Sequence, residues 1–242
     1  VLSETITSEI FLKLQNELEK LWKNVDLSAK KLNQFNQICS EFYKDKTYER
    51  VSKYLDRYPE DVKSFEINNL ECLPIYDLLE SIEWEKLIDG IPSRIHGDLH
   101  FENIIYNEKK DRFTFLDWRQ DFGGEIEYGD IYYDLAKLLH GILVPHPTIV
   151  DGGYSITESE LRKKIEISRA ENIKTLEDSF KKWVVEKGYD LRKIELLCSL
   201  IFLNIAPLHH HPYSKFLFSL GHWSLQCIID KNPINWSHYD SN

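Results

Sequence analysis

Residues 96–103 read His-Gly-Asp-Leu-His-Phe-Glu-Asn, and residues 115–118 read Phe-Leu-Asp-Trp. These two segments contain three side chains whose oxygen atoms suit phosphoryl transfer. Asp98 can accept the proton of an attacking hydroxyl group, while Asn103 and Asp117 offer the hard oxygen ligands that Mg²⁺ prefers. The segments therefore predict a site for phosphoryl transfer.

The residues between the two segments predict how the proposed metal ligands meet. Residues 104–106 and 112–116 are rich in β-forming side chains, and the polar turn 107–111 separates them. We therefore expect a β-hairpin with Asn103 at the entry of its first strand and Asp117 at the exit of its second. Antiparallel pairing brings those two ends together.

The residues before the hairpin predict the position of Asp98. Residues 93–96 read as a short strand that leads into a turn at Gly97. Glycine permits a sharp turn where a side chain would crowd an approaching phosphate or substrate. We expect the loop 97–102 to bring Asp98 beside the two ends of the hairpin.

These motifs, followed by Gly-Asp-Ile-Tyr-Tyr-Asp-Leu-Ala at residues 129–136, resemble the aminoglycoside phosphotransferase and choline kinase family. This family is a branch of the protein-kinase-like fold, and the resemblance covers roughly residues 90–140. It implies that Asp98 is the catalytic base and that Asn103 and Asp117 bind the metal. It also implies a structural role for three further residues, namely His96, Gly97 and Asp134, the last of which would cap a helix and steady the catalytic loop.

The resemblance implies that a γ-phosphoryl group moves from ATP or GTP, with Mg²⁺, to a hydroxyl group of a small molecule. Choline, another amino-alcohol, a sugar or an aminoglycoside-like compound would serve as the acceptor. In the family, the acceptor lies among residues after the metal-binding aspartate. Arg119, Gln120 and Asp121 are therefore candidates for substrate binding, although a solvated turn explains them equally well. His100 is a further candidate.

The fold class that follows is mainly α with a small β-hairpin, corresponding to the C-terminal lobe of a kinase-like fold. The first glycine is Gly90, so residues 1–89 read as helices and not as a glycine-rich β lobe. The chain begins with Val1 and contains no methionine. We therefore expect a fragment whose N-terminal lobe is missing or replaced by a fused domain.

The remaining chain predicts further helices and a division into two parts. Pro145, Pro147, Gly152 and Gly153 mark a boundary, giving a catalytic core at residues 1–144 and a helical subdomain at residues 145–242. A capping box at residues 157–160 predicts a long helix towards Trp183, so we expect the second part to be all-helical. The apolar periodicity predicts other helices within residues 10–22, 29–42, 48–58, 75–82, 130–142, 191–205 and 213–229.

Composition limits the partners and the compartment. Thirty basic and forty acidic residues give a formal charge of −10, which disfavours nucleic acid and suits a cationic substrate. The apolar runs are too short to predict a membrane span. Four widely spaced cysteines without a Cys-x-x-Cys pair indicate buried free thiols, so we expect a cytoplasmic protein.

Two alternatives stay open from the sequence. His96, Asp98 and His100 alternate, so on an extended strand they would face one way and could serve a metal-dependent hydrolase. Gly97 instead favours a turn at this position. The second alternative is a kinase-like docking or regulatory module fused to another catalytic domain.

Overall fold

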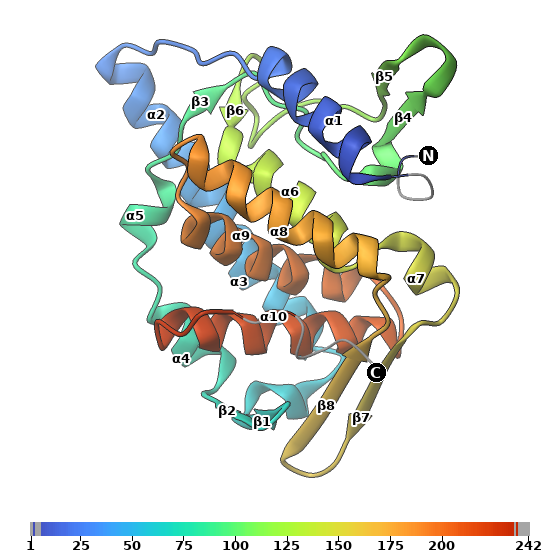
Figure 1. Ribbon diagram of the computed structural model, residues 1–242. Helices are drawn as coiled ribbons and strands as arrows, with labels where there is room; N and C mark the ends of the chain where they lie inside the picture. Colours follow the sequence, from blue (N-terminus) through green and yellow to red (C-terminus); the bar gives the residue numbers. More distant parts are fainter. Residues whose placement is uncertain (1, 3–5, 235, 237–242) are drawn as a thin grey trace.

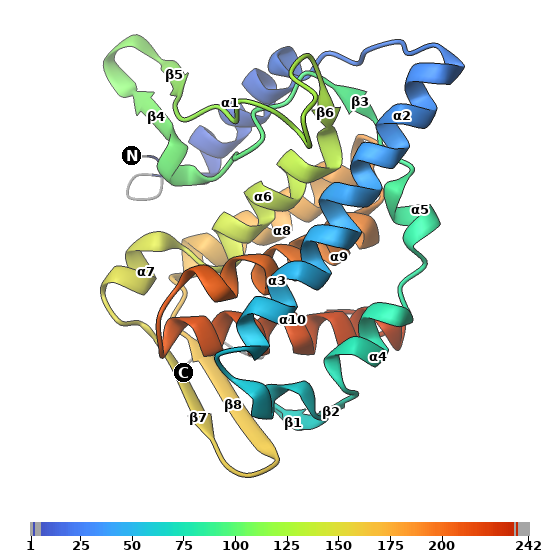
Figure 2. The same cartoon turned by 180° about the vertical axis from the view of Figure 1, so that it is seen from behind.

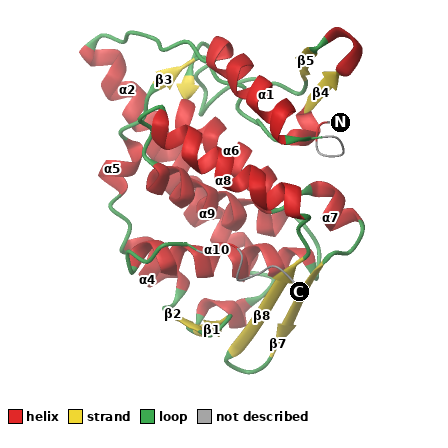
Figure 3. Cartoon of the chain, viewed as in Figure 1, coloured by secondary structure: helices red, strands yellow, loops and turns green. Residues whose placement is uncertain are grey.

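A computed structural model describes residues 2, 6–234 and 236 of the chain (Figures 1 and 2). The fold is mainly α-helical, as predicted, and its strands form small sheets (Figure 3). The α-helices are α1 (Ser8–Leu21), α2 (Ala29–Ser40), α3 (Lys46–Leu55), α4 (Ile75–Glu80), α5 (Trp84–Ile88), α6 (Ile131–Leu143), α7 (His146–Val150), α8 (Glu171–Glu186), α9 (Leu191–Ile205) and α10 (Tyr213–Ile229). The strands are β1 (Phe65–Ile67), β2 (Leu70–Cys72), β3 (Pro92–Ser93), β4 (Ile104–Asn107), β5 (Arg112–Phe115), β6 (Gly129–Asp130), β7 (Tyr154–Glu158) and β8 (Arg162–Ile167).

Helices α6, α9 and α10 form the centre of the molecule, with α8 packed over α6 and α9 (Figure 1). In α6 every residue except His140 is buried, and α10 is buried along almost its whole length. Helices that are apolar on nearly all sides are typically enclosed by other elements. At Gly221 the two helices α9 and α10 approach so closely that a Cβ atom would lie 2.9 Å from the backbone oxygen of Ser199.

Helices α2 and α3 are joined by a π-helical segment, η2 (Glu41–Asp45), and form one long rod (Figure 2). The wider winding of a π-helix changes which side chains face inward, and here it coincides with two buried aromatic residues, Phe42 and Tyr43. The helical predictions for this region are confirmed. Leu32, an apolar residue of the predicted helix 29–42, is 38% exposed.

The predicted hairpin is present as β4 and β5, which pair antiparallel with Ile104 opposite Phe115. The backbone N–H of Leu116 donates to the carbonyl oxygen of Asn103 at 2.8 Å, so the entry and the exit of the hairpin meet as expected. The strand predicted at residues 93–96 is shorter. It is β3, which pairs with β6 immediately before α6.

The prediction of a long helix that begins at residues 157–160 is wrong. Those residues lie at the tip of the β7–β8 hairpin, and α8 begins only at Glu171. Buried and more exposed side chains alternate along residues 162–167, with Lys163, Ile165 and Ile167 buried. This alternation has the period of a strand, and it prevails over the capping-box pattern. The second part of the chain is therefore not all-helical.

The β7–β8 hairpin belongs to a sheet with the strand order β2-β1-β8-β7. β1 and β2 lie within the region predicted to be helical, and Asn68 and Asn69 join them with positive φ angles of 46° and 65°. Asparagine tolerates this left-handed conformation in two-residue hairpin turns. The Asn68 amide also bonds both the N–H and the carbonyl oxygen of Ile165, which links the two hairpins.

A buried ion pair connects this sheet to the helical core. Lys163 Nζ lies 2.6 Å from Asp61 Oδ1, and both side chains are almost fully buried. Tyr54 on α3 donates its hydroxyl group to Asp61 Oδ2 at 2.6 Å. Glu158 supplies a second carboxylate, 3.2 Å from Lys163 Nζ. The position of the β7–β8 hairpin therefore depends on a charged cluster whose central ion pair, between Lys163 and Asp61, is shielded from water.

Two further sequence predictions can be compared with the described residues. All four cysteines are buried free thiols, as expected. Within the described ranges, no helix combines the length and the apolar character that crossing a membrane requires.

Replacing Asp61 with alanine should destabilise the fold, because Lys163 and the Tyr54 hydroxyl group would lose their main buried partner. We expect the free energy of unfolding to fall by about 3 kcal/mol, as measured by urea denaturation. Asp56→Ala, at an exposed position next to the end of α3, is the matched control and should change it by less than about 0.5 kcal/mol. Equal effects of the two substitutions would contradict a stabilising role for the cluster.

Candidate functional site

The site is built around the carboxylate of Asp134, which lies in the first turn of α6 and is fully buried. Its Oδ2 atom accepts hydrogen bonds from Trp22 Nε1 at 3.0 Å and from the backbone N–H of His96 at 2.7 Å. Its Oδ1 atom accepts from the backbone N–H of Gly97 at 2.7 Å. Burial raises the pKa of Asp134 to about 6 even though these donors favour the ionised form. The carboxylate thus fixes the start of the loop that carries Asp98.

Asp130 holds the other end of the same region. It caps α6 by accepting from the backbone N–H of Tyr132 at 3.1 Å, and it also accepts from the N–H of Ile91 and from the Tyr43 hydroxyl group. These bonds tie α6 to the strand before the loop and to η2. Asp130 therefore positions elements around the site without entering it.

Gly97 adopts a positive φ of 83°, in the region that favours glycine. A Cβ atom here would lie 2.5 Å from the Cβ atom of Arg119. The Arg119 backbone N–H donates to the carbonyl oxygen of His96 at 2.9 Å, so the two segments run against each other. The structure thus shows Arg119 as a close neighbour that requires a glycine at this position.

Asp98 is partly exposed and is held by several contacts. Lys137 Nζ lies 2.8 Å from its Oδ1 atom. Asn103 Nδ2 donates to the Asp98 backbone oxygen at 3.0 Å and to its Oδ2 atom at 3.3 Å. His100 Nε2 is 3.5 Å from Oδ2, and the other ring nitrogen of His100 is 2.8 Å from Glu102 Oε2. The carboxylate is therefore oriented by residues on both sides.

These contacts determine the charge of the site. Burial favours neutral Asp98, but the His100 hydrogen bond and the Lys137 ammonium group outweigh it and hold the pKa of Asp98 well below its usual value. For His100, burial lowers the pKa, whereas its hydrogen bonds to Asp98 and Glu102 raise it and prevail. Asp98 is therefore a carboxylate at neutral pH and can accept a hydrogen bond from a hydroxyl group.

Asn103 and Asp117 lie at adjacent ends of the β4–β5 hairpin, as the sequence predicts. Because the amide nitrogen of Asn103 bonds Asp98, its Oδ1 atom is left as a possible metal ligand. Asp117 is exposed, and its positive φ of 52° marks a sharp turn immediately after β5. An amide oxygen and a carboxylate match the oxygen donors that Mg²⁺ prefers, so this pair fits the ion chemically.

The residues named for a metal-dependent hydrolase do not form such a centre. His96 is fully buried, and its Nδ1 atom accepts from the backbone N–H of Asp98 at 3.3 Å. Burial lowers the pKa of His96, which leaves the ring neutral. Across the described part of the chain, no group of three histidine, cysteine, aspartate or glutamate side chains is placed to hold a metal ion. The geometry of the His96, Asp98 and His100 side chains therefore does not support this alternative.

A cavity of about 280 Å³, here called the Asp98 cavity, opens beside the carboxylate. One wall comes from the helical rod and from α6, and the opposite wall is a largely apolar face of α9. Its lining residues are Phe42, Tyr43, Lys46, Arg50, Asp98, Arg119, Tyr133, Lys137, Leu197, Leu200, Ile201, Asn204, Ile205 and Leu208. The volume lies just below the usual range for small-molecule sites, so the cavity suits a small ligand.

The four candidates for substrate binding lie in different places in the structure. Arg119 lines the Asp98 cavity and also lines another cavity, of about 260 Å³, together with Gln120 and Asp121, which do not reach the Asp98 cavity. His100 lines neither cavity and instead contacts Asp98 and Glu102. The prediction that residues after position 118 reach an acceptor pocket beside Asp98 therefore fits Arg119 alone among these four.

Sequence reasoning missed several residues of the Asp98 cavity. Lys137 carried a usable signal, because it is a lysine within the otherwise apolar stretch of α6 and is buried in the fold. There was no such signal for Lys46 and Arg50, which lie four residues apart on one face of α3. Nothing in the neighbouring sequence indicates which helix these two side chains face. Their role emerges only when the helical rod packs beside α6 and α9.

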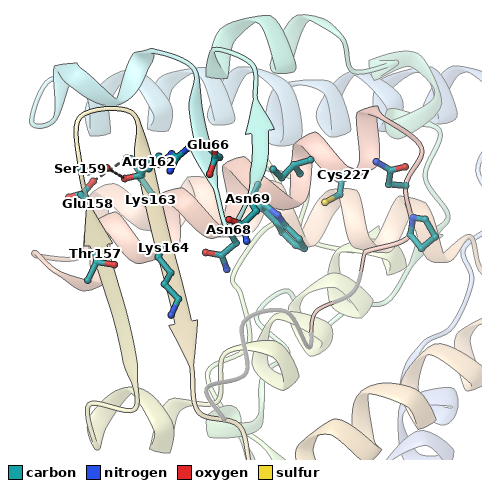
Figure 4. A pocket seen from close by; sticks show the side chains of 14 residues that line it. Glu66, Asn68, Asn69, Thr157, Glu158, Ser159, Arg162, Lys163, Lys164 and Cys227 are labelled. Carbon is teal, nitrogen blue, oxygen red and sulfur yellow. Dashed lines mark hydrogen bonds and ion pairs between the residues drawn. The ribbon is translucent and has the colours of Figure 1, made fainter.

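A larger cavity, of about 870 Å³, lies elsewhere, between the turn joining β1 and β2, the β7–β8 hairpin and α10. Figure 4 shows Asn68 and Asn69 from the turn, and Lys163 and Lys164 from β8, around it. Its lining includes none of the residues predicted to be catalytic. Size alone therefore does not identify the site.

Comparison with known proteins adds one finding. The model of a family described as "Phosphotransferase enzyme family" (APH) matches residues 19–158, which is more than half of the chain. The matched range contains Asp98, Asn103, Asp117 and Asp134. Searches of curated proteins and of solved structures give no match.

Asp134→Asn should destabilise the fold, because the amide group replaces one acceptor oxygen with a donor facing buried N–H groups. We expect a loss of about 2 kcal/mol or more in the free energy of unfolding, measured by urea denaturation. Asp178→Asn, at an exposed position of α8, is the control and should be nearly neutral. A stable Asp134→Asn protein would refute the structural role assigned to this carboxylate.

Proposed function

Because the chain belongs to the phosphotransferase enzyme family, we propose that it transfers the γ-phosphoryl group of ATP or GTP to a hydroxyl group of a small molecule. The observation that carries this proposal is the Asp98 carboxylate in the wall of a cavity sized for a small ligand. The hydroxyl group of the acceptor would lie against Asp98, and the nucleotide would approach from the side of Asn103 and Asp117.

Asp98 would orient the acceptor and take its proton. As the acceptor oxygen forms a bond to the γ-phosphorus, the bond from that phosphorus to the bridging oxygen breaks and the nucleoside diphosphate leaves. Each Asp98 oxygen has more than one lone pair, so contacts with Lys137 and Asn103 still leave room for a hydroxyl group. Holding the reacting groups in place is the main contribution expected of the protein.

Asn103 Oδ1 and Asp117 would hold Mg²⁺. The ion would neutralise charge on the nucleotide phosphates when bound. Asn103 also bonds Asp98 through its amide nitrogen, so this one side chain would connect the metal-binding oxygens to the proton acceptor. A segment that covers the nucleotide would have to join the site, since residues 6–89 supply helices and the short β1–β2 hairpin.

Replacing Asp98 with asparagine in the intact protein should reduce kcat by roughly 100-fold or more, because the proton acceptor is lost. Nucleotide affinity, measured by calorimetry in the presence of Mg²⁺, should change little. Turnover is followed as nucleoside diphosphate released with a panel of hydroxylated metabolites. Asp178→Asn serves as the control, and a kcat for Asp98→Asn within threefold of the wild-type value would disprove the assignment.

Asp117→Ala should weaken binding of the Mg²⁺–nucleotide complex by roughly tenfold or more, because one metal ligand is removed. Calorimetry in excess Mg²⁺ and in EDTA measures the effect, and the difference between wild type and variant should disappear in EDTA. Glu108→Ala, on the same hairpin but exposed at its tip, is the matched control. A metal-independent loss of binding would assign Asp117 to another role.

A further inference from the structure

The Asp98 cavity has an unusual charge for a chain with a formal charge of −10. Four cationic side chains line it, namely Lys46, Arg50, Arg119 and Lys137, whereas Asp98 is the single carboxylate among its lining residues. Lys137 is paired with Asp98. In the described part of the chain, the other three cations form no ion pair, so the cavity carries excess positive charge.

Two of these cations, Lys46 and Arg119, lie over aromatic rings. Lys46 Nζ lies 4.2 Å from the centroid of the Phe42 ring, and the Arg119 guanidinium carbon lies 5.0 Å from the same centroid. Arg119 is also 6.0 Å from the centroid of Tyr133. Rings attract cations through their faces but supply no counter-ion. Burial is the largest cause that lowers the pKa of Lys46, and repulsion from Arg119 and Arg50 lowers it further, to about 8.

The rest of the cavity also favours a polar ligand of limited size. Asn204 on α9 lines it, and within the described residues its buried Oδ1 atom has no hydrogen-bond partner. A buried polar atom without a partner is costly, and a ligand hydroxyl group would satisfy it. Leu197 and Ile201 add an apolar surface for a short carbon skeleton.

We propose that the acceptor is an anionic alcohol, a small hydroxylated molecule bearing a carboxylate or phosphate group that Lys46, Arg50 and Arg119 hold while its hydroxyl group faces Asp98. This inference rests on the proposed function, and it replaces the cationic acceptor suggested by the net charge. The anion belongs to the acceptor and not to the nucleotide, because neither Asn103 nor Asp117 lines the Asp98 cavity.

The first test compares acceptors that differ mainly in charge. The intact protein, ATP or GTP and Mg²⁺ are incubated with glycerol, glycerate, glycerol phosphate, glucose, glucose 6-phosphate, ethanolamine and choline. Turnover should favour an anionic compound over its neutral counterpart by at least about tenfold in kcat/KM, because each charge-assisted bond contributes roughly 1.5–3 kcal/mol. Preference for choline, ethanolamine or the neutral compounds would overturn the anionic acceptor and leave the phosphotransferase proposal standing.

The second test changes the cations. Lys46→Gln and Arg50→Gln should each raise KM for the anionic acceptor by roughly 10- to 100-fold, with little change in kcat or in nucleotide affinity, and Lys46→Arg should retain most of the affinity. Lys53→Gln, on the exposed side of α3, is the matched control. Weaker nucleotide binding with an unchanged acceptor KM would place the anion on the nucleotide and overturn the inference.

A binding measurement separates failure of this inference from failure of the proposed function. Glycerate and glycerol phosphate are titrated by calorimetry into wild-type, Lys46→Gln and Lys53→Gln protein, each checked by its urea midpoint. If Lys46→Gln weakens binding and Lys53→Gln does not, the result supports the anionic site even if no compound is phosphorylated. If neither compound binds and none of the anionic alcohols is phosphorylated, the inference is wrong.

Discussion

The Asp134 carboxylate accepts hydrogen bonds from Trp22 Nε1 and from the backbone N–H groups of His96 and Gly97. Through these bonds α1, α6 and the loop bearing Asp98 share one buried acceptor, although Trp22 and Asp134 are 112 residues apart. Three donors buried without an acceptor would be costly, so the loop has little freedom to move away from α6. The position of Asp98, and with it the geometry of the whole candidate site, follows from this constraint.

Under the proposed function, the arrangement of charges around Asp98 would allow one small site to serve two negatively charged partners. Lys137 and His100 keep Asp98 ionised, and Asn103 connects it to the oxygens offered for a metal. Lys46 and Arg50 lie in the wall of the Asp98 cavity, which neither Asn103 nor Asp117 lines. Negative charge on the acceptor and on the nucleotide would thus be compensated by separate groups. The acidic surface of the chain says little about this interior, because net charge averages over residues that do not contact a ligand.

The sequence was informative where local chemistry decides the structure. The hairpin around residues 107–111, the meeting of its two ends, and the bounds of α9 and α10 all follow from turn residues and apolar periodicity. The prediction failed at residues 157–167, where a capping pattern indicated a helix and the alternation of side chains indicated a strand. The strand β8 formed, because it pairs with β1. Prediction also failed for the cations of α3, because their proximity to Asp98 depends on helix packing, which no local pattern encodes.

The π-helical segment η2 precedes Lys46 and Arg50 directly. A π-helical turn contains one residue more than the α-helical turn it replaces, and one residue corresponds to about 100° of rotation around a helix axis. Regular winding through residues 41–45 would therefore shift Lys46 and Arg50 by about 100° around the helix axis relative to α2. The side from which Lys46 and Arg50 line the Asp98 cavity thus depends on the helical phase that this π-helical segment sets.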